Sequence, residues 1–209
     1  MNTRTRSRTL VPLLLFSLAG IAPSRHGSAS AAEPSEAAIT PAGDQRIRTH
    51  AEATPPDLPD GGLHPDLVAI DGWLQADITS LEELEGQIVA VQFWTFDCSN
   101  WLATLDHMKE LYAHYHDQGF EIVGIHSPEF DYEAIPDNVA TAAERLGVTW
   151  PIALDTSKRT FHAWQDGSTS YWPRIYLLDR AGHIRYDHIG EGRYHEIDAA
   201  VRALLAEPS

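Results

Sequence analysis

The chain has 209 residues, of which 43% are hydrophobic and 22% charged, and its formal net charge at pH 7 is −15. Its 30 acidic residues outnumber 15 basic ones, and a surface with that balance repels nucleic acid and anionic lipid. The composition therefore argues against a nucleic-acid partner, and it leaves both an enzyme and a binding module open.

The first 32 residues have the order of charged, apolar and small residues that is typical of a secretory signal peptide. Arg4, Arg6 and Arg8 precede an apolar run at 10–22, which is shorter than the roughly 20 residues of a membrane-spanning helix. We therefore expect a cleaved signal peptide over residues 1–32 and an exported protein, not membrane-spanning, in a periplasm. Without these residues, 11 basic and 30 acidic residues give a formal charge of −19.

The composition changes twice after the predicted signal peptide. Residues 33–63 are rich in Ala, Pro, Glu, Asp and Gly and have few large apolar side chains, which predicts a flexible linker. Residues 64–209 have a globular pattern and the length of one ordinary domain.

The first half of this domain contains a predicted strand, helix and strand. Before them, Ser80 to Glu83 has the form of a capping box and predicts a short helical turn. The apolar run at 88–94, IVAVQFW, predicts a strand buried on both faces. Apolar residues then recur at helical spacing over 102–115, and 120–127 is a second strand. The order predicts a βαβ unit with a parallel strand pair.

The second half predicts two helices, a hairpin and a final helix. Gly147 closes the first of these helices, and the turn at 180–183 joins the two strands of the hairpin. A βαβ half followed by a ββα half predicts an α/β fold with a central mixed sheet flanked by helices on both faces. The predicted elements are a helix at 137–146, a short apolar segment at 151–155, a helix at 157–164, strands at 174–179 and 183–189, and a helix at 194–206.

Cys98 is the only cysteine of the chain and lies where the first long strand meets the first long helix. Three motifs around it occur in one order: FWTFDCSNW, then GIHSPEF, then YWPRIYLLDRAGHIRYDHIGEG. In this order the sequence over 71–205 resembles extracytoplasmic thioredoxin-like domains of the TlpA and DipZ type, which are redoxin and AhpC/TSA-like proteins. The resemblance implies a thioredoxin-like fold. It also implies a cis proline at Pro173, preceded by Trp172, where an extended substrate chain would lie beside Cys98.

One residue departs from the pattern of that family. Cys98 matches the attacking cysteine of its two-cysteine motif, whereas Trp101 stands at the position of the resolving cysteine. The amides of residues 99–101 should be aimed at the thiol and favour its anion, and Asp97 should oppose this. A mixed disulfide formed at Cys98 would need an outside thiol for its release. The expected partners are therefore thiols and disulfides of proteins or small molecules.

Three functions remain open for a single thiol in this position. The first is monothiol thiol-disulfide exchange, and the second is a thioredoxin-fold binding module without redox activity. The third is a one-cysteine peroxidase, for which Thr95 stands three residues before the cysteine and Arg174 could approach the thiolate. Val91 stands where a peroxidase of that kind has proline.

Further candidate residues surround the cysteine in the predicted fold. An aromatic rim around Cys98 that suits recognition of an apolar extended peptide is one expectation for Trp94, Trp101, Tyr171 and Trp172, and core packing would also use these residues.

His126 and Glu129 follow the second strand and are candidates for a proton relay to the thiol. His107 and His114 lie two helical turns apart and are expected to belong to a solvated helix face. No metal site and no cofactor are therefore expected, and the oligomeric state is not predicted.

Overall fold

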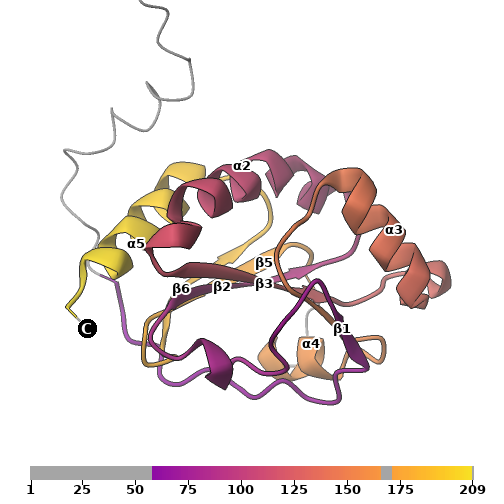
Figure 1. The fold of residues 1–209 in the computed structure, drawn as a ribbon, viewed down its shortest axis with the longest axis horizontal. Helices are drawn as coiled ribbons and strands as arrows, with labels where there is room; N and C mark the ends of the chain where they lie inside the picture. The colour runs from indigo at the N-terminus through magenta and orange to yellow at the C-terminus, as the bar shows by residue number, and fades with distance from the viewer. Residues whose placement is uncertain (1–57, 166–170, 209) are drawn as a thin grey trace, which may run out of the picture. The chain divides into compact units, whose positions relative to one another are not determined.

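A mixed sheet of six strands forms the centre of the domain (Figure 1). The computed structural model describes residues 58–165 and 171–208, so the predicted signal peptide and most of the predicted linker lie outside the described residues. The strand order is β1-β4-β3-β2-β5-β6. β2 pairs with β3 and β3 with β4 in parallel, and the other three pairs are antiparallel. The strands are β1 (Gly72–Leu74), β2 (Ile88–Trp94), β3 (Phe120–His126), β4 (Ile152–Leu154), β5 (Arg174–Leu178) and β6 (Ile184–Ile189).

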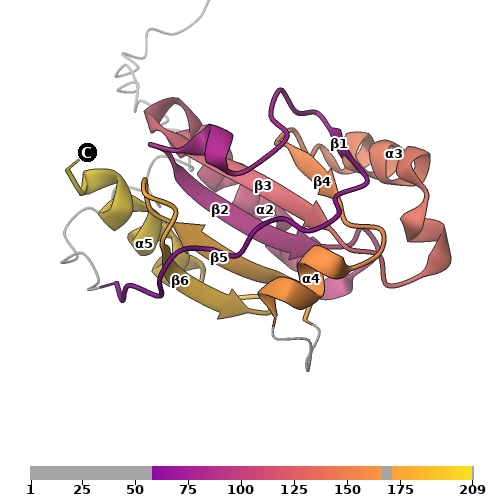
Figure 2. The ribbon, with the colours of Figure 1, turned by 90° about the horizontal axis from the view of Figure 1, so that it is seen from below.

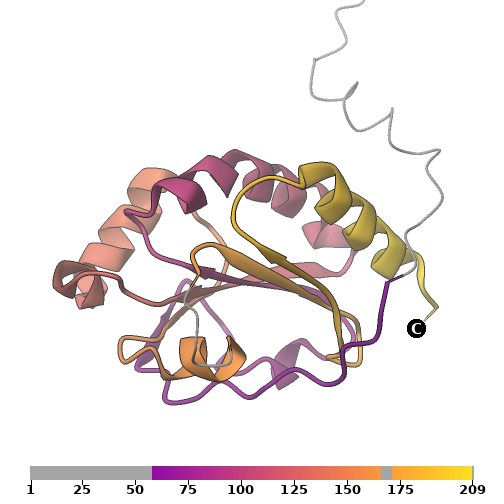
Figure 3. The same cartoon turned by 180° about the vertical axis from the view of Figure 1, so that it is seen from behind.

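Helices cover both faces of this sheet, as the order of predicted elements indicated. Helices α2, α3 and α5 lie on one face, whereas η1 and α4 lie on the other (Figures 1 and 3). The helices are η1 (Glu82–Leu84), α2 (Ser99–Tyr115), η2 (His116–Gln118), η3 (Asp131–Ala134), α3 (Pro136–Leu146), α4 (Arg159–Trp164) and α5 (Tyr194–Ala206). The α/β prediction with a mixed sheet flanked on both faces is confirmed.

The predicted burial of β2 on both faces follows from the alternation of its side chains. Ile88, Ala90 and Trp94 belong to the core under α2, α3 and α5. Val89, Val91 and Phe93 belong to the core under η1 and α4. All seven residues of the strand are buried. Because successive side chains of a strand point to opposite faces, one apolar run supplies both cores.

Three connections meet at one end of the sheet. The parallel register of β2 and β3 places the last residue of each strand side by side, Trp94 opposite His126. The antiparallel register of β2 and β5 places Phe93 opposite Arg174, the first residue of β5. The carboxyl ends of β2 and β3 and the start of β5 therefore lie at the same edge, which Figure 2 shows on the side of α4. Cys98 follows β2 at this edge.

Three local details differ from the sequence prediction. The predicted helical turn is present, but its N-cap is Leu81 and not Ser80, and no side chain of the described residues caps it; Glu83 Oε1 also accepts hydrogen bonds from the N–H and hydroxyl of Thr79. The short edge strand β1 was not predicted, since three residues are too few to show a period. The expected boundary between linker and domain at residue 63 lies inside a packed stretch. Gly61 N donates to Ile184 O over 2.8 Å, and Leu63 bridges to His183.

Candidate functional site

Cys98 lies between β2 and α2, at the residue that caps the helix. Its N–H donates to Thr95 O over 3.3 Å, and its carbonyl accepts a helical hydrogen bond from Leu102 N over 2.9 Å. The two bonds fix the backbone of this tight turn while the cysteine remains only half-buried. The backbone of the cysteine is therefore held in place, and the residue as a whole keeps part of its surface exposed.

The Cys98 sulfur contacts the loop before β5. Its Sγ lies 3.6 Å from Trp172 O, a distance at which the thiol donates a weak hydrogen bond to the carbonyl. Within the described residues, the side chain forms no capping hydrogen bond with the amides of residues 99–101 that were expected to be aimed at it. A thiolate has no proton to donate, so the contact with Trp172 O belongs to the protonated cysteine.

Trp172 and Pro173 lie beside Cys98 as the resemblance implied, and the peptide bond between them is cis. The Trp172 ring stacks on Phe161 with 4.6 Å between the ring centroids. Its Nε1 donates to Ser127 O over 3.0 Å. These contacts leave Trp172 half-buried, whereas Pro173 is buried. Part of the indole therefore faces solvent next to the cysteine.

Trp94 and Trp101 do not belong to an exposed rim, so this part of the prediction is wrong. Both side chains are 0% exposed, and their ring centroids lie 4.3 Å apart. Trp101 Nε1 donates to Gln92 Oε1 over 3.0 Å. The Thr104 hydroxyl donates to Trp101 O over 2.8 Å and accepts from Gln92 Nε2 over 3.4 Å. The first turn of α2 points residue 101 into the core, where the indole fills the position expected for a second thiol.

A different pair of aromatic residues is exposed beside the cysteine. Phe130 is 52% and Tyr132 44% exposed, and their rings stack with centroids 5.7 Å apart. The Tyr132 hydroxyl donates to Asp97 Oδ2 over 2.6 Å, a bond that raises the pKa of Tyr132 to about 12. The signal for this surface is the alternation of acidic and aromatic residues in the stretch EFDYE at 129–133, which the sequence analysis did not use.

Glu133 is a buried carboxylate that the sequence analysis did not identify. The residue is 0% exposed. Its Oε1 accepts from Asp97 N over 3.2 Å, and its Oε2 accepts from Glu129 N and Phe130 N over 2.8 and 2.9 Å. One side chain therefore joins the turn after β2 to the loop after β3. Hydrogen bonds to a charged group contribute about 1.5–3 kcal/mol each, so this carboxylate is a main support of the turn that carries the cysteine.

The two residues expected to relay protons have different surroundings. His126 is 2% exposed and packs against the rings of Trp94 and Phe96, with centroid distances of 4.9 and 5.6 Å. Burial lowers the pKa of His126 to about 4, although the nearby Glu133 charge acts in the opposite direction. The imidazole is therefore neutral near pH 7 and closed off from solvent, which argues against a relay through it. Glu129 is exposed, and its backbone N–H is bonded to Glu133.

The sequence of the domain matches that of a known family. The sequence model of the AhpC/TSA family matches residues 65–187, which is more than half of the chain. The chain belongs to the AhpC/TSA family. This membership confirms the redoxin resemblance on which Cys98, Trp172 and Pro173 were selected.

Curated relatives place this AhpC/TSA domain near thiol-disulfide proteins. Protein DipZ of Mycobacterium tuberculosis is 38% identical over 147 residues, which are 69% of this chain and 21% of that protein. Thiol-disulfide oxidoreductase ResA of Geobacillus kaustophilus is 29% identical over 146 residues, 69% of this chain and 77% of that protein. The chain thus spans about a fifth of the length of the DipZ proteins that it matches.

Solved structures confirm a thioredoxin-like fold for this member of the AhpC/TSA family. A thiol-disulfide isomerase from Corynebacterium glutamicum superposes with a TM-score of 0.59 at 20% identity, covering 73% of this chain and 99% of that chain. A thiol:disulfide interchange protein of the thioredoxin family from Chlorobium tepidum gives 0.54 at 23% identity, covering 75% and 100%. At 20% and 23% sequence identity, the similarity of these structures establishes the fold alone.

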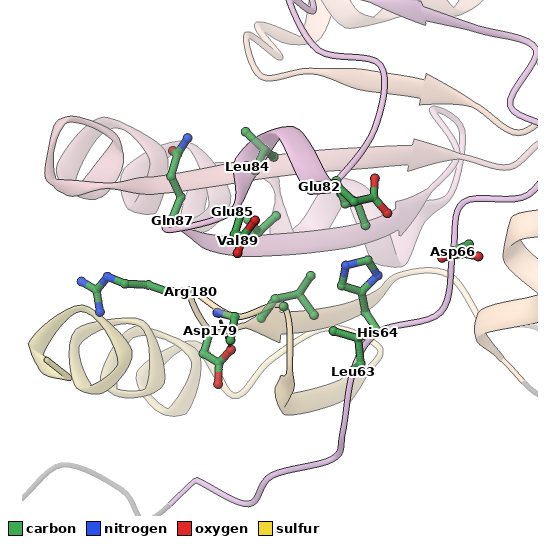
Figure 4. A pocket seen from close by; sticks show the side chains of 14 residues that line it. Leu63, His64, Asp66, Glu82, Leu84, Glu85, Gln87, Val89, Asp179 and Arg180 are labelled. Carbon is green, nitrogen blue, oxygen red and sulfur yellow. Dashed lines mark hydrogen bonds between the residues drawn. The ribbon is translucent and has the colours of Figure 1, made fainter. Parts of the chain in front are cut away.

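A cavity of about 250 Å³ in the AhpC/TSA domain lies away from Cys98 (Figure 4). Part of its lining comes from the start of β2, the end of β5 and the turn that follows. These ends of the strands are the ones farther from Cys98. Leu84, Val89 and Leu178 contribute apolar surface. The Arg180 side chain turns away toward α5, where it donates to the carbonyls of Leu204, Leu205 and Glu207. This cavity is not part of the cysteine site.

The histidines of α2 differ from the expected solvated face. His114 is exposed, but His107 stacks on Tyr194 with centroids 4.7 Å apart, and burial lowers its pKa. Among residues 58–165 and 171–208, no three His, Cys, Asp or Glu side chains come together as metal ligands would. In the same part of the chain, no helix has the length and apolar character needed to cross a membrane.

Proposed function

We propose that this protein is a thiol-dependent oxidoreductase that exchanges thiols and disulfides through Cys98 alone. The observation that carries the proposal is the half-buried residue Cys98, whose sulfur lies 3.6 Å from Trp172 O, together with the buried Trp101 at the position expected for a second thiol. The AhpC/TSA membership and the name of the ResA relatives, thiol-disulfide oxidoreductase, support the class of reaction.

The reaction has two steps that balance without a second cysteine in the chain. After Cys98 loses its proton to solvent, the thiolate attacks one sulfur of a substrate disulfide. A new bond joins that sulfur to Cys98 Sγ, and the other substrate sulfur leaves as a thiolate that takes up a proton. An external thiol then attacks the substrate sulfur of this mixed disulfide and releases Cys98, so that the electrons come from the external thiol.

A second candidate function is binding without redox chemistry. The observation that favours it is the network of Trp101, Gln92 and Thr104, which fills the resolving position with packed and hydrogen-bonded side chains. A site under selection for dithiol exchange would not bury an indole there. In this alternative, the surface beside Trp172 and Pro173 holds a partner and Cys98 takes no part in chemistry.

A one-cysteine peroxidase has weaker support from the geometry. The Arg174 guanidinium donates through Nε and Nη2 to Asp187 over 2.9 and 2.6 Å, and it lies 4.8 Å from the centre of the Tyr176 ring. This arginine, which the sequence analysis considered for an approach to the thiolate, is therefore engaged by a carboxylate. Consumption of hydrogen peroxide by the reduced protein with an external thiol, compared with Cys98→Ser, tests this class directly.

Two measurements on Cys98 separate exchange from binding. The first is the rate of alkylation by iodoacetamide across pH, because an ordinary thiol reacts appreciably only as it ionises near about 8.5. The second is trapping of mixed disulfides in cells that produce the wild type, with Cys98→Ser as the matched control. We expect alkylation of wild type that Cys98→Ser lacks, and mixed-disulfide adducts that dithiothreitol removes. An unreactive Cys98, in a strain where Cys98→Ser keeps every phenotype, would establish the binding module instead.

We also propose that the protein acts outside the cytoplasmic membrane, in a periplasm. The support is the order of charged, apolar and small residues over 1–32, together with the resemblance to extracytoplasmic domains. N-terminal sequencing of the native protein tests this, and we expect it to begin near residue 32. A sequence that starts at Met1 would contradict export by a cleaved signal peptide.

A further inference from the structure

An exposed surface beside Cys98 combines aromatic and acidic side chains, and we call it the aromatic-acidic surface. Its apolar part is Phe130, Tyr132 and Ile135, which are 52%, 44% and 49% exposed. Phe130 and Tyr132 stack on each other, and contiguous exposed apolar side chains are a mark of interaction surfaces. Its acidic members are the exposed residues Asp97, Glu129 and Asp131.

The loop that displays these side chains is held from inside. Glu133 binds the amides of Asp97, Glu129 and Phe130, and Asn138 Nδ2 donates to Tyr132 O over 2.8 Å. The backbone is therefore fixed without help from the exposed rings, which stack on each other with an interplanar angle of 5°. A surface that is ordered before its partner arrives loses little conformational entropy on binding.

Acidic residues outnumber basic ones in the stretch of sequence that supplies this surface. Between residues 97 and 135, Lys109 is the only Lys or Arg. A different charge lies near Trp172, whose carbonyl contacts Cys98, because Lys158 Nζ is 5.8 Å from the centre of the Trp172 ring. A bound chain that reaches both Asp97 and Trp172 therefore meets a carboxylate at the first residue and an ammonium group near the second.

We propose that the aromatic-acidic surface binds an extended segment of a substrate protein that carries Lys or Arg next to a bulky apolar side chain. The inference rests on the proposed function and names its substrate class. The apolar side chain packs against Phe130 and Tyr132, and the cation faces Asp97, Glu129 and Asp131. A cation over an exposed aromatic face gains further attraction. Segments rich in Glu and Asp are disfavoured, because like charges repel across an interface.

Binding without chemistry tests the surface separately from the thiol. The Cys98→Ser protein is titrated with fluorescein-labelled ten-residue peptides that have serine in place of the substrate cysteine. One peptide carries two lysines and two leucines on one side of the serine, a second has glutamate for lysine, and a third has alanine for leucine. We expect the first to bind about tenfold more tightly than either of the others, with the advantage over the glutamate peptide shrinking as salt is raised. Equal binding of the lysine and glutamate peptides overturns the proposal.

Substitutions on the surface give the second arm of the experiment. Phe130→Ala and Tyr132→Ala in the Cys98→Ser background are each expected to weaken binding of the lysine–leucine peptide by about tenfold, because exposed aromatic anchors dominate such contacts. Leu63→Ala is the matched control, since Leu63 is 68% exposed and bridges to His183 at the opposite edge. An unchanged affinity in both aromatic variants, with normal circular dichroism, refutes the assignment.

The outcomes separate this inference from the proposed function. If wild-type protein forms mixed disulfides but Cys98→Ser shows no preference among the peptides, the aromatic-acidic surface is not the substrate site and thiol exchange stands. If Cys98→Ser binds the lysine–leucine peptide selectively while the wild-type thiol is inert, the surface stands as a binding site and the redox function fails.

Discussion

The indole of Trp101 donates a hydrogen bond to Gln92 Oε1 over 3.0 Å, and both side chains are buried under the turn that carries Cys98. Position 101, where the resemblance implies a resolving thiol, is thus part of the core. Thr104 completes the network through its hydroxyl. The Trp101 side chain is therefore coupled to its neighbours, and replacing it disturbs their hydrogen bonds.

Substitution of Trp101 tests this coupling through stability. Trp101→Phe keeps a buried ring but leaves Gln92 Oε1 without its donor, which should lower the free energy of unfolding by about 1–3 kcal/mol. Trp101→Cys also removes most of the side-chain volume and should cost about 3–5 kcal/mol. Urea unfolding followed by circular dichroism measures both. A cost for Trp101→Phe that persists unchanged in a Gln92→Leu background would show that the hydrogen bond does not contribute.

The same Trp101→Cys variant tests the chemistry that is missing. A folded variant should release mixed disulfides intramolecularly and raise the turnover of insulin or glutathione-disulfide reduction above that of wild type. Trp101→Ser is the matched control, since it makes a similar cavity without a thiol. If turnover does not rise in a variant shown to be folded, the surrounding site has diverged along with the cysteine.

Glu133 gives a prediction about the turn before α2. Glu133→Gln replaces one carboxylate oxygen by an amide group, which cannot accept a hydrogen bond from a backbone N–H. At least one of the bonds to Asp97, Glu129 or Phe130 is lost, and we expect a destabilisation of about 1–3 kcal/mol. The rate of Cys98 alkylation should change with it, because Asp97 precedes the cysteine. Glu129→Gln, at an exposed carboxylate in the same loop, should leave both measurements unchanged.

The fold could be predicted from the sequence because its signals are periodic and agree with one another. The buried run at 88–94, the helical spacing that follows it and the hairpin at 174–189 each indicate one element and its neighbours. The side on which residue 101 lies was harder to predict. A tryptophan in the first turn after a cysteine suits either an exposed aromatic rim or the hydrophobic core. The rotation of α2 about its own axis decides between them, and it turns the Trp101 side chain toward the sheet.

The sequence analysis also missed Glu133, which supports the turn before α2 by accepting hydrogen bonds from backbone N–H groups, and the two exposed aromatic residues of the same loop. Glu133 lies in a charged, aromatic stretch that predicts a solvated turn, and its burial depends on how the loop after β3 folds against Asp97. Phe130 and Tyr132 were missed because an exposed aromatic residue cannot be told from a buried one by composition alone. The sequence singled out Cys98 as the candidate, and the three-dimensional structure was needed to find the side chains that support its turn.

The buried imidazole of His126 predicts how stability depends on pH. Burial lowers its pKa from 6.5 in the unfolded chain to about 4 in the folded protein. The unfolded chain therefore binds a proton that the folded protein excludes between these values. The free energy of unfolding therefore has its full value, as far as His126 is concerned, above pH 6.5. It falls as the pH is lowered to about 4, by roughly 3 kcal/mol in all.

Urea unfolding of wild type and His126→Phe from pH 7.5 to 4 measures this loss. Titration of other groups is common to the two proteins, so only the difference between their pH slopes reports on His126. We expect the wild type to lose stability more steeply below pH 6.5 than the variant. His114→Gln, at an exposed histidine of α2, should follow the wild type. Parallel slopes for wild type and His126→Phe would contradict a buried, neutral imidazole.

The carboxylate of Asp97 should restrain the reactivity of the cysteine that follows it. A negative charge next to a thiol opposes formation of a second negative charge, and the Tyr132 hydroxyl holds this carboxylate in place over 2.6 Å. We expect Asp97→Asn to raise the iodoacetamide rate at pH 7 by about threefold in low salt, and less in about 0.5 M salt, where the charge is screened. Asp117→Asn removes an exposed carboxylate at the far end of α2 and should leave the rate unchanged. A rate in Asp97→Asn that equals wild type at every ionic strength would mean that the Trp172 O contact, and not this charge, governs the sulfur.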